Sequence, residues 1–404
     1  MNHPNSSGEY FHQGVIKFGS EVSSELTDPT SYANVHESLG KLLKDPDDEA
    51  FDLAAACVLA NGREGDAAAL FLVAPPSTGK TEIVNAMSDV PWAYEQTSMT
   101  PQTFASGMKV TAGGKNPSLL KRLTAKNQTC LLNKEFTTVM EMRQSDRDSV
   151  ISTLREIMDG SLTKDFGTGD RVDWHGKLGL LAAVTPEIEK RWAIQTSLGA
   201  RWVWVRLKIP ESISDRTGIA YAAIEADETT KLLRAELKKR TTQLLVACKG
   251  LPDALISEDS KKYLANLAEL TARGRTVVDK DRDGVPTGVK PSPEGPGRLA
   301  KAFHRLAGSL ALVRGHTEVT AEDLRSLRRV AEDTVPVARA AIYRVLSKQP
   351  STVRDLVEET GMSSSTIERT LSELELLDLC HSDSDSAGVV GRPRNVWTAV
   401  SRTQ

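Results

Sequence analysis

The sequence predicts an α/β fold, because short apolar runs alternate with amphipathic segments. Residues 70–73, 129–136 and 178–184 have the length and apolar character of buried strands. Residues 147–158 repeat apolar side chains at i, i+1, i+4, i+7 and i+8, the pattern of an amphipathic helix. A helical pattern at 48–61 leads into the first strand.

The composition is that of an ordinary globular protein. The chain has 404 residues, 39% hydrophobic and 26% charged, and this length suggests about two to four domains. No apolar run approaches the roughly 18 residues of a membrane span, and the polar start of the chain predicts a disordered tail at 1–30. Four scattered cysteines fit neither a disulfide framework nor a metal site. We therefore expect a cytoplasmic protein with no membrane partner.

Charge is distributed unevenly along the chain. The net charge is −3, so the chain as a whole is not a polycation, although Lys and Arg are in excess between 231 and 315. Such a face suits DNA, but the solvated surfaces of ordinary helices have a similar composition. Charge alone therefore identifies no partner.

The most informative stretch joins the first strand to a helix. The apolar run at 70–73 ends in a turn, and an amphipathic segment begins directly after it. Strand, loop and helix in this order predict a phosphate-binding loop, whose backbone N–H groups and helix N-terminus bind nucleotide phosphates. The residues expected to bind ATP are Pro76, Ser77, Thr78, Gly79, Lys80 and Thr81.

Two residues of this loop have distinct expected roles. Lys80 would reach the β- and γ-phosphates, and the Thr81 hydroxyl would hold Mg²⁺. Ala74 stands where the usual pattern G-x-x-x-x-G-K-[ST] has its first glycine, and it would be strained if that turn needed a positive φ. The alternative is an ordinary strand–turn–helix that happens to contain Gly-Lys-Thr. The flanking strand and helix favour nucleotide binding, with ATP and Mg²⁺ as cofactors.

The strand at 129–136 carries a carboxylate near its end. An ATPase needs an acid beside its phosphate loop to order the Mg²⁺ shell or to polarise the attacking water. Glu135 is the expected residue and also a candidate metal-shell group, and Asn133 is a weaker candidate for the same task. The alternative is a strand end with a solvated glutamate.

Three further elements follow the helix at 147–158, which Gly160 is expected to stop. Residues 164–175 form a predicted β-hairpin that turns at 167–169. The apolar strand at 178–184 ends at a threonine, and a last strand at 198–207 has an arginine near its entrance.

The order of these parts resembles the sequence plan of AAA+ ATPases. Residues 154–160, the hairpin and residues 181–185 look like the pre-sensor-1 hairpin clade, which includes minichromosome-maintenance-type helicases and bacterial enhancer-binding proteins. The resemblance covers roughly residues 45–345. It implies a P-loop AAA+ core, a parallel sheet flanked by helices, at 31–210, followed by an α-helical lid at 211–340.

The resemblance also implies roles for single residues. Thr185 takes the sensor-1 place, where Asn is more usual, and Arg298 matches the sensor-2 position. Arg201 matches an arginine finger that acts on a neighbouring subunit, which implies a homo-oligomeric ring, most often a hexamer. A strand-edge salt bridge is the alternative for Arg201. Lys164 or Arg171 of the hairpin would touch the DNA backbone in the central channel, unless both are simply solvated charges.

Residues 341–404 form a separate module that resembles a winged helix-turn-helix. A helix at 341–346 and a second one capped by Thr352 precede a third helix, which a capping box from Ser365 to Glu368 is expected to begin. Short strands around a basic turn follow.

This module suits DNA or a protein partner. The residues expected to contact DNA are Ser363, Ser364, Thr366 and Arg369 in the major groove, and Arg392 and Arg394 on phosphates or in the minor groove. Glu368, Glu373 and Glu375 on the third helix would repel a phosphate backbone. Docking of another protein therefore remains the alternative.

The leading hypothesis is a DNA-dependent, ring-forming ATPase, a replicative-type helicase or translocase like those that serve mobile genetic elements. A second hypothesis is a DNA-tethered, ATP-dependent regulator that does not unwind DNA, which the single acid at Glu135 favours. A third is a scaffold held together by nucleotide without turnover, which Arg201 and Arg298 disfavour.

Overall fold

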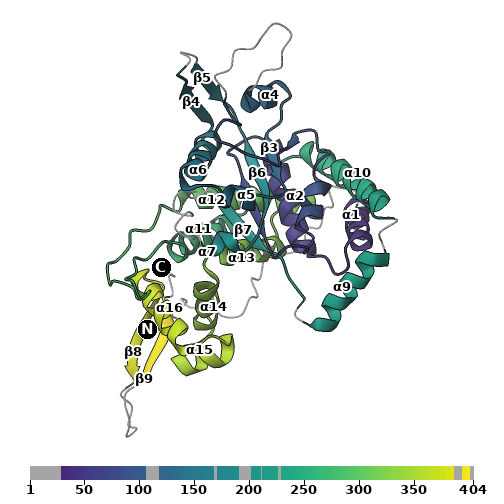
Figure 1. The fold of residues 1–404 in the computed structure, drawn as a ribbon. Helices are drawn as coiled ribbons and strands as arrows, with labels where there is room; N and C mark the ends of the chain where they lie inside the picture. The colour runs from purple at the N-terminus through teal and green to yellow at the C-terminus, as the bar shows by residue number, and fades with distance from the viewer. Residues whose placement is uncertain are drawn as a thin grey trace, which may run out of the picture. The chain divides into compact units, whose positions relative to one another are not determined.

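The computed structural model describes residues 29–105, 118–167, 171–190, 202–210, 212–225, 229–385 and 394–400. The chain divides into two compact units, each shown in Figure 1. The sheet unit comprises the described residues up to Ala265 together with Gly297–Val330, and the C-terminal unit comprises Asn266–Pro296 together with the described residues from Ala331 onwards. The expected tail at 1–30 lies outside the described residues, except for its last two residues, which begin a helix.

A five-stranded sheet forms the centre of the sheet unit, in the order β2-β3-β6-β1-β7, and every neighbouring pair is parallel. Its strands are β1 (Ala69–Val73), β2 (Ala93–Glu95), β3 (Cys130–Asn133), β6 (Gly179–Val184) and β7 (Trp202–Arg206). The strands predicted at 70–73, 129–136 and 178–184 are therefore confirmed, with β3 shorter than expected. Parallel strands bring their carboxyl ends to one edge, and this edge follows β1, β3 and β6.

Different helices cover the two faces of this sheet (Figure 1). On one face, Phe71 stacks on Trp202 with ring centroids 5.0 Å apart, in a core shared with α6 (Gln144–Met158). On the other face, α2 (Asp48–Gly62) contacts β1, β3 and β6. Every residue of α2 from Ala50 to Asn61 is buried, because further helices pack on its outer side.

A β-hairpin lies between α6 and β6 in the chain, as predicted for residues 164–175 (Figure 1). β4 (Ser161–Asp165) pairs antiparallel with β5 (Arg171–His175), and Leu162 of β4 and Val172 and Trp174 of β5 enter the core. Gly160 joins α6 to β4 with φ at 89°, a conformation that glycine adopts without steric cost. The tip at 168–170 lies outside the described residues.

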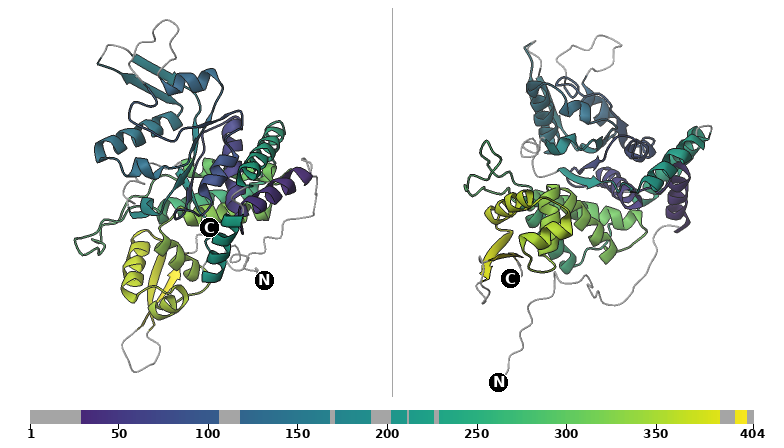
Figure 2. Two further views of the ribbon diagram at one scale, coloured as in Figure 1. Left: turned by 45° about the vertical axis from the view of Figure 1, so that its right-hand side comes forward. Right: turned by 60° about the horizontal axis from the view of Figure 1, so that its bottom comes forward.

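The remaining helices surround the sheet and lead into the C-terminal unit (Figure 2). α1 (Pro29–Leu42) and α3 (Lys80–Ala86) both pack against α10 (Thr230–Lys249), and α12 (Gly297–Val313) packs against α2. The others are α4 (Leu119–Ala125), α5 (Thr137–Met140), α7 (Glu187–Lys190), α9 (Ile213–Glu225), α11 (Glu258–Gly274) and α13 (Ala321–Asp333). Among the described residues, no helix is both long enough and apolar enough to cross a bilayer.

The C-terminal unit contains three helices followed by a two-stranded antiparallel sheet, as predicted. Its elements are α14 (Val337–Leu346), α15 (Val353–Thr360), α16 (Ser364–Leu376), β8 (Cys380–Asp385) and β9 (Arg394–Ala399). Val278, from the segment that follows α11, is 4% exposed within the same core. The unit therefore includes residues well before the predicted boundary at 341.

The ends of the short helices show which local predictions hold. Thr352 and Asp355 form a capping box at the start of α15, and Gly361 ends that helix with φ at 69°. The capping box predicted from Ser365 to Glu368 is wrong. Ser363 is the N-cap of α16, because its hydroxyl accepts the Thr366 N–H at 3.3 Å, and Ser365 already lies inside the helix.

A buried network of polar side chains joins the helices of the sheet unit. Asp52 of α2 is 2% exposed and accepts hydrogen bonds from Tyr32 at 2.8 Å and from Arg314 at 3.0 Å. Arg314 also binds Asp323 of α13 at 3.1 Å. Burying a carboxylate without a partner costs free energy, so the loss of any one of these side chains would leave a buried charge unpaired and destabilise the unit.

Two histidines extend this network. His36 lies 2.9 Å from both Asp48 and Asp52, and although burial lowers its pKa, the hydrogen bonds to Asp52 and Asp48 raise it above 6.5. The hydrogen bond from His316 to Asp323, at 3.0 Å, likewise raises the pKa of that imidazole. Both histidines therefore bind protons more tightly in the folded chain than in the unfolded chain.

We predict that the stabilisation contributed by His36 and His316 falls as the pH rises through neutrality. The contribution of a histidine whose pKa is raised by folding is complete below its unfolded pKa of about 6.5, and it is lost as the pH rises through the folded pKa. Urea denaturation should therefore show a larger difference in unfolding free energy between wild type and the double variant His36→Asn, His316→Asn at about pH 6 than at pH 8. An equal difference at the two pH values would contradict the assignment.

Candidate functional site

The predicted phosphate loop connects β1 to α3 and has the backbone geometry of a tight turn. Ser77 has φ at 62° and Gly79 has φ at 87°, so the left-handed positions lie late in the loop. Ala74 does not have a positive φ, and its N–H donates to the Val184 carbonyl at 3.2 Å. The departure from the usual glycine at Ala74 therefore introduces no backbone strain.

The Lys80 side chain folds back over this loop. Its ammonium donates to the carbonyl oxygens of Ala74 at 2.6 Å and Pro75 at 2.5 Å, and lies 3.5 Å from the Thr78 hydroxyl. Burial lowers the pKa of Lys80, whereas the carboxylate of Glu135 opposes this shift. The ammonium is thus held at the mouth of the loop, where a phosphate oxygen can replace a carbonyl as its partner.

The rest of the loop presents groups that suit an anion. Pro76, Ser77 and Thr81 are exposed, and Thr78 and Gly79 are half-buried. The Thr81 hydroxyl makes no hydrogen bond within the described part of the chain. No cluster of three or more His, Cys, Asp or Glu is found among the described residues. A Mg²⁺ ion here would therefore rely on Thr81, one carboxylate and phosphate oxygens, a donor set that this ion commonly takes.

Glu135 lies at the same sheet edge as Lys80, as the sequence predicts. It follows β3 and is exposed, and its charge acts on the Lys80 ammonium. Asn133 is fully buried, and its amide donates to the carbonyls of Gln96 at 2.6 Å and Thr97 at 3.0 Å. Its side-chain oxygen accepts the Glu135 N–H at 3.0 Å, so Asn133 positions the acid and does not reach a metal itself.

Thr185 directly follows β6, beside the end of β3. Its N–H donates to the Thr137 hydroxyl at 3.1 Å, and the two hydroxyls are 3.4 Å apart. The register pairs Val184 of β6 with Val73 of β1, immediately before the phosphate loop. The structure thus brings Lys80, Glu135 and Thr185 to one edge of the sheet.

Of the two expected arginines, the structure describes only Arg298. Arg201 lies outside the described residues. Arg298, at the start of α12, forms an ion pair with Asp159 at 3.9 Å, beyond the end of α6. Among the described side chains, Arg298 has no hydrogen bond or ion pair with Lys80, Glu135 or Thr185.

The hairpin places its two predicted DNA contacts differently. Lys164 is half-buried, donates to the Pro101 carbonyl at 3.3 Å and lies over the Phe166 ring. Arg171 is 60% exposed and only weakly paired with Asp165 at 4.0 Å. Arg171 is therefore available to a ligand, whereas Lys164 must first leave its carbonyl partner.

The third helix of the C-terminal unit exposes the side chains predicted to read DNA. Ser364, Thr366 and Arg369 of α16 are all exposed. Arg394 is the first residue of β9, and Arg392 lies outside the described residues.

The expected repulsion of DNA by this helix is smaller than the sequence suggested. Glu373 is 7% exposed and pairs with Arg339 at 2.7 Å and Lys280 at 2.6 Å, so its charge is neutralised inside the unit. Glu368 and Glu375 remain exposed. Sequence reasoning missed Arg339 and Lys280, because neither is close to Glu373 in the chain.

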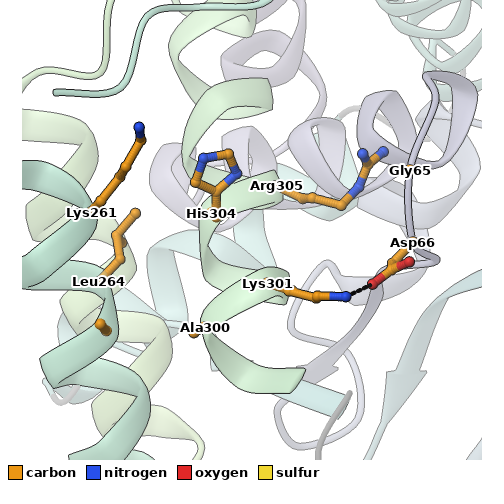
Figure 3. A pocket seen from close by; sticks show the side chains of 9 residues that line it. Gly65, Asp66, Lys261, Leu264, Ala300, Lys301, His304 and Arg305 are labelled. Atoms are coloured by element: carbon orange, nitrogen blue, oxygen red, sulfur yellow. Dashed lines mark ion pairs between the residues drawn. The ribbon is translucent and has the colours of Figure 1, made fainter. Parts of the chain in front are cut away.

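A pocket of about 460 Å³ opens between α11, α12 and the turn before β1 (Figure 3). Its basic residues already have partners: Lys301 pairs with Asp66 at 3.3 Å, Lys261 with Glu258 at 2.7 Å, and Arg305 with backbone carbonyls. The turn precedes β1, so the pocket lies toward the amino ends of the strands and not beside the phosphate loop. We do not assign it to the same site.

Comparison with known proteins identifies one part of the chain. Residues 328–385 match the family model of the DprA winged helix domain. This range runs from within α13 to the end of β8. No curated protein matches the chain. The chain is thus an α/β protein with a five-stranded parallel sheet and a C-terminal winged helix domain.

We predict that Arg339→Met locally destabilises the winged helix domain. Arg339 is 3% exposed and also donates to the carbonyls of Gly274 and Thr276, so its loss leaves buried acceptors and Glu373 with fewer partners. Breaking such a pair costs about 3 kcal/mol, which should speed amide hydrogen exchange in α16 about 100-fold. Arg354→Met is the matched control, because Arg354 pairs with Glu358 at 2.9 Å but is 77% exposed. Equal exchange rates in the two variants would contradict a structural role for Arg339.

Proposed function

We propose that this chain is an ATP-hydrolysing, DNA-dependent AAA+ protein that assembles into a ring and acts as a helicase or translocase. The observation that carries the proposal is the meeting of three groups at one sheet edge. Lys80 lies at the mouth of a turn with two left-handed residues, and Glu135 and Thr185 follow the neighbouring strands. Ligands of open parallel sheets bind at this edge.

Each group has a role that its position supports. Lys80 and the loop N–H groups bind the phosphates, and Thr81 supplies a hydroxyl to Mg²⁺. Glu135, fixed through its N–H by Asn133, orients the attacking water, and Thr185 adds a hydroxyl beside it. When bound, Mg²⁺ neutralises charge on the phosphates.

A neighbouring subunit would complete this site. Arg298 is paired with Asp159, and Arg234 of α10 is bound by Glu82 of α3 at 2.6 Å. A transition-state arginine is worth several orders of magnitude in phosphoryl transfer. Arg201, which leads into β7, is the proposed source of that charge for the next subunit in a ring.

DNA is the proposed partner because of the winged helix domain. The matching family is a winged helix, and α16 exposes Ser364, Thr366 and Arg369 on its outer surface. Helices of this kind enter the major groove in helix-turn-helix proteins. Arg171 of the hairpin offers a second, exposed cation for the phosphate backbone.

A DNA-tethered, ATP-dependent switch that does not unwind DNA is the second candidate. Glu368 and Glu375 remain exposed on α16, which weakens nonspecific attraction to a duplex. The single carboxylate at Glu135, without an adjacent acid, also suits slow turnover.

We predict that Lys80→Ala lowers the affinity for ATP by about 100-fold or more, because it removes the cation that meets the phosphates. Isothermal titration calorimetry with ATP and Mg²⁺ measures this change. Lys121→Ala is the control, since Lys121 is an exposed lysine of α4 in the same unit. Unchanged affinity in Lys80→Ala would refute nucleotide binding at this loop.

We also predict that steady-state ATP hydrolysis rises when DNA is added, and that Glu135→Gln reduces turnover about 100-fold while ATP still binds. Glu141→Gln, a nearby exposed glutamate, should retain wild-type turnover. A slow rate of hydrolysis that neither single- nor double-stranded DNA changes would exclude the helicase function and favour the ATP-dependent switch.

A further inference from the structure

The pocket between α11, α12 and the turn before β1 combines cationic side chains with an apolar floor. Lys261 and Leu264 project from α11, and Ala300 and His304 from α12 (Figure 3). Its volume of about 460 Å³ falls within the range of small-molecule sites, roughly 300–1,000 Å³. We call it the α11–α12 pocket. Its lining suits a ligand that has both a charged group and an apolar part.

Positive charge exceeds negative charge in the lining of this pocket. Lys261, Lys301 and Arg305 are cationic, and Asp66 is the one carboxylate among the lining residues that the structure describes. Lys301 pairs with Asp66 at 3.3 Å, which compensates one of the three positive charges. Lys261 and Arg305 therefore lack a carboxylate partner within the lining.

The two remaining cations differ in how firmly they are held. Lys261 pairs with Glu258 at 2.7 Å, but these side chains are 47% and 78% exposed, and exposed pairs contribute little to stability. Lys261 can therefore exchange Glu258 for a more highly charged anion. The Arg305 guanidinium donates to the carbonyls of Ala60 and Glu64, so its charge is fixed in place.

These charges act on one another through the pocket. The His304 ring lies between Lys261 and Arg305 (Figure 3), and its pKa is lowered by burial and by both of these cations, although Asp253 opposes the shift. Burial and the charge of Arg305 also lower the pKa of Lys177, just before β6, to about 7. A local excess of positive charge of this kind favours an anionic ligand.

We infer that the α11–α12 pocket binds a small organic phosphate, whose phosphate group lies between Lys261 and a protonated His304 and whose apolar part covers Leu264 and Ala300. A phosphate monoester carries about 1.5 to 2 negative charges at pH 7, enough to compensate both groups, whereas a carboxylate carries one. The pocket lies toward the amino ends of the strands. The inference therefore does not depend on the proposed nucleotide site.

The test follows the His304 imidazole of the full chain by NMR, with histidine labelled with ¹³C and the signal assigned through His304→Gln. Phenyl phosphate is the probe, because it joins a phosphate to an apolar ring. Without it, the pKa of His304 should lie below 6.5. Saturating phenyl phosphate should raise the proton affinity of His304 about tenfold, because the anion stabilises the imidazolium.

The concentration of phenyl phosphate that shifts the His304 signal halfway gives the dissociation constant. Lys261→Gln should weaken binding about 10-fold, because it removes a cation that meets the phosphate. Lys262→Gln is the matched control, because Lys262 is 76% exposed on the same helix but does not line the pocket. Inorganic phosphate should bind about 10-fold more weakly than phenyl phosphate, since it leaves the apolar floor uncovered.

Three results would overturn the inference. One is a His304 signal that phenyl phosphate does not change at any concentration. A second is equal affinity in Lys261→Gln and Lys262→Gln, with circular dichroism showing that both variants are folded. The third is a His304 signal that responds to duplex DNA but not to phenyl phosphate, which would assign the pocket to a nucleic-acid backbone instead.

Discussion

The sheet unit depends on one buried carboxylate. Asp52 lies in the middle of α2, a helix buried from Ala50 to Asn61 between the sheet and its outer helices. An unpaired charge there would cost several kcal/mol, so its partners on α1 and at the end of α12 must be in place together. The same helix packs against β1, the strand that leads into the phosphate loop. The position of the phosphate loop is thus tied, through α2, to polar contacts on the far side of the unit.

The sequence predicts best those features that neighbouring residues decide. The loop at Lys80, the end of α15 at Gly361 and the β4–β5 hairpin each follow from a few adjacent residue types. The capping box at Ser365 fails because Ser363 offers the same chemistry two residues earlier, and the helix begins at the first residue that can satisfy it. The Asp52–Arg314 pair spans 262 positions, and no local pattern encodes it.

The candidate site shows the same division. Residue types place Lys80, Glu135 and Thr185 at strand ends, because parallel strands share an edge. Residue types do not reveal backbone angles, so only the structure shows that Ala74 has no positive φ and is not strained. Residue types do not reveal burial either. Asn133 is enclosed by β2 and the loop that follows it. Glu373 is expected to repel DNA, but Arg339 and Lys280 neutralise its charge.

The two units are interleaved along the chain, because residues 297–330 return to the sheet unit before the C-terminal unit resumes at Ala331. No single cut separates the units. A fragment that starts at Ala331 lacks Val278 from its core and the carbonyls that bind Arg339. A fragment that starts at Asn266 includes α12 without the sheet unit that α12 packs against. During synthesis, Asn266–Pro296 emerges well before the helices it packs against. The winged helix domain therefore completes its fold only after β9 has been synthesised, because β9 pairs with β8 and places Trp397 in the core.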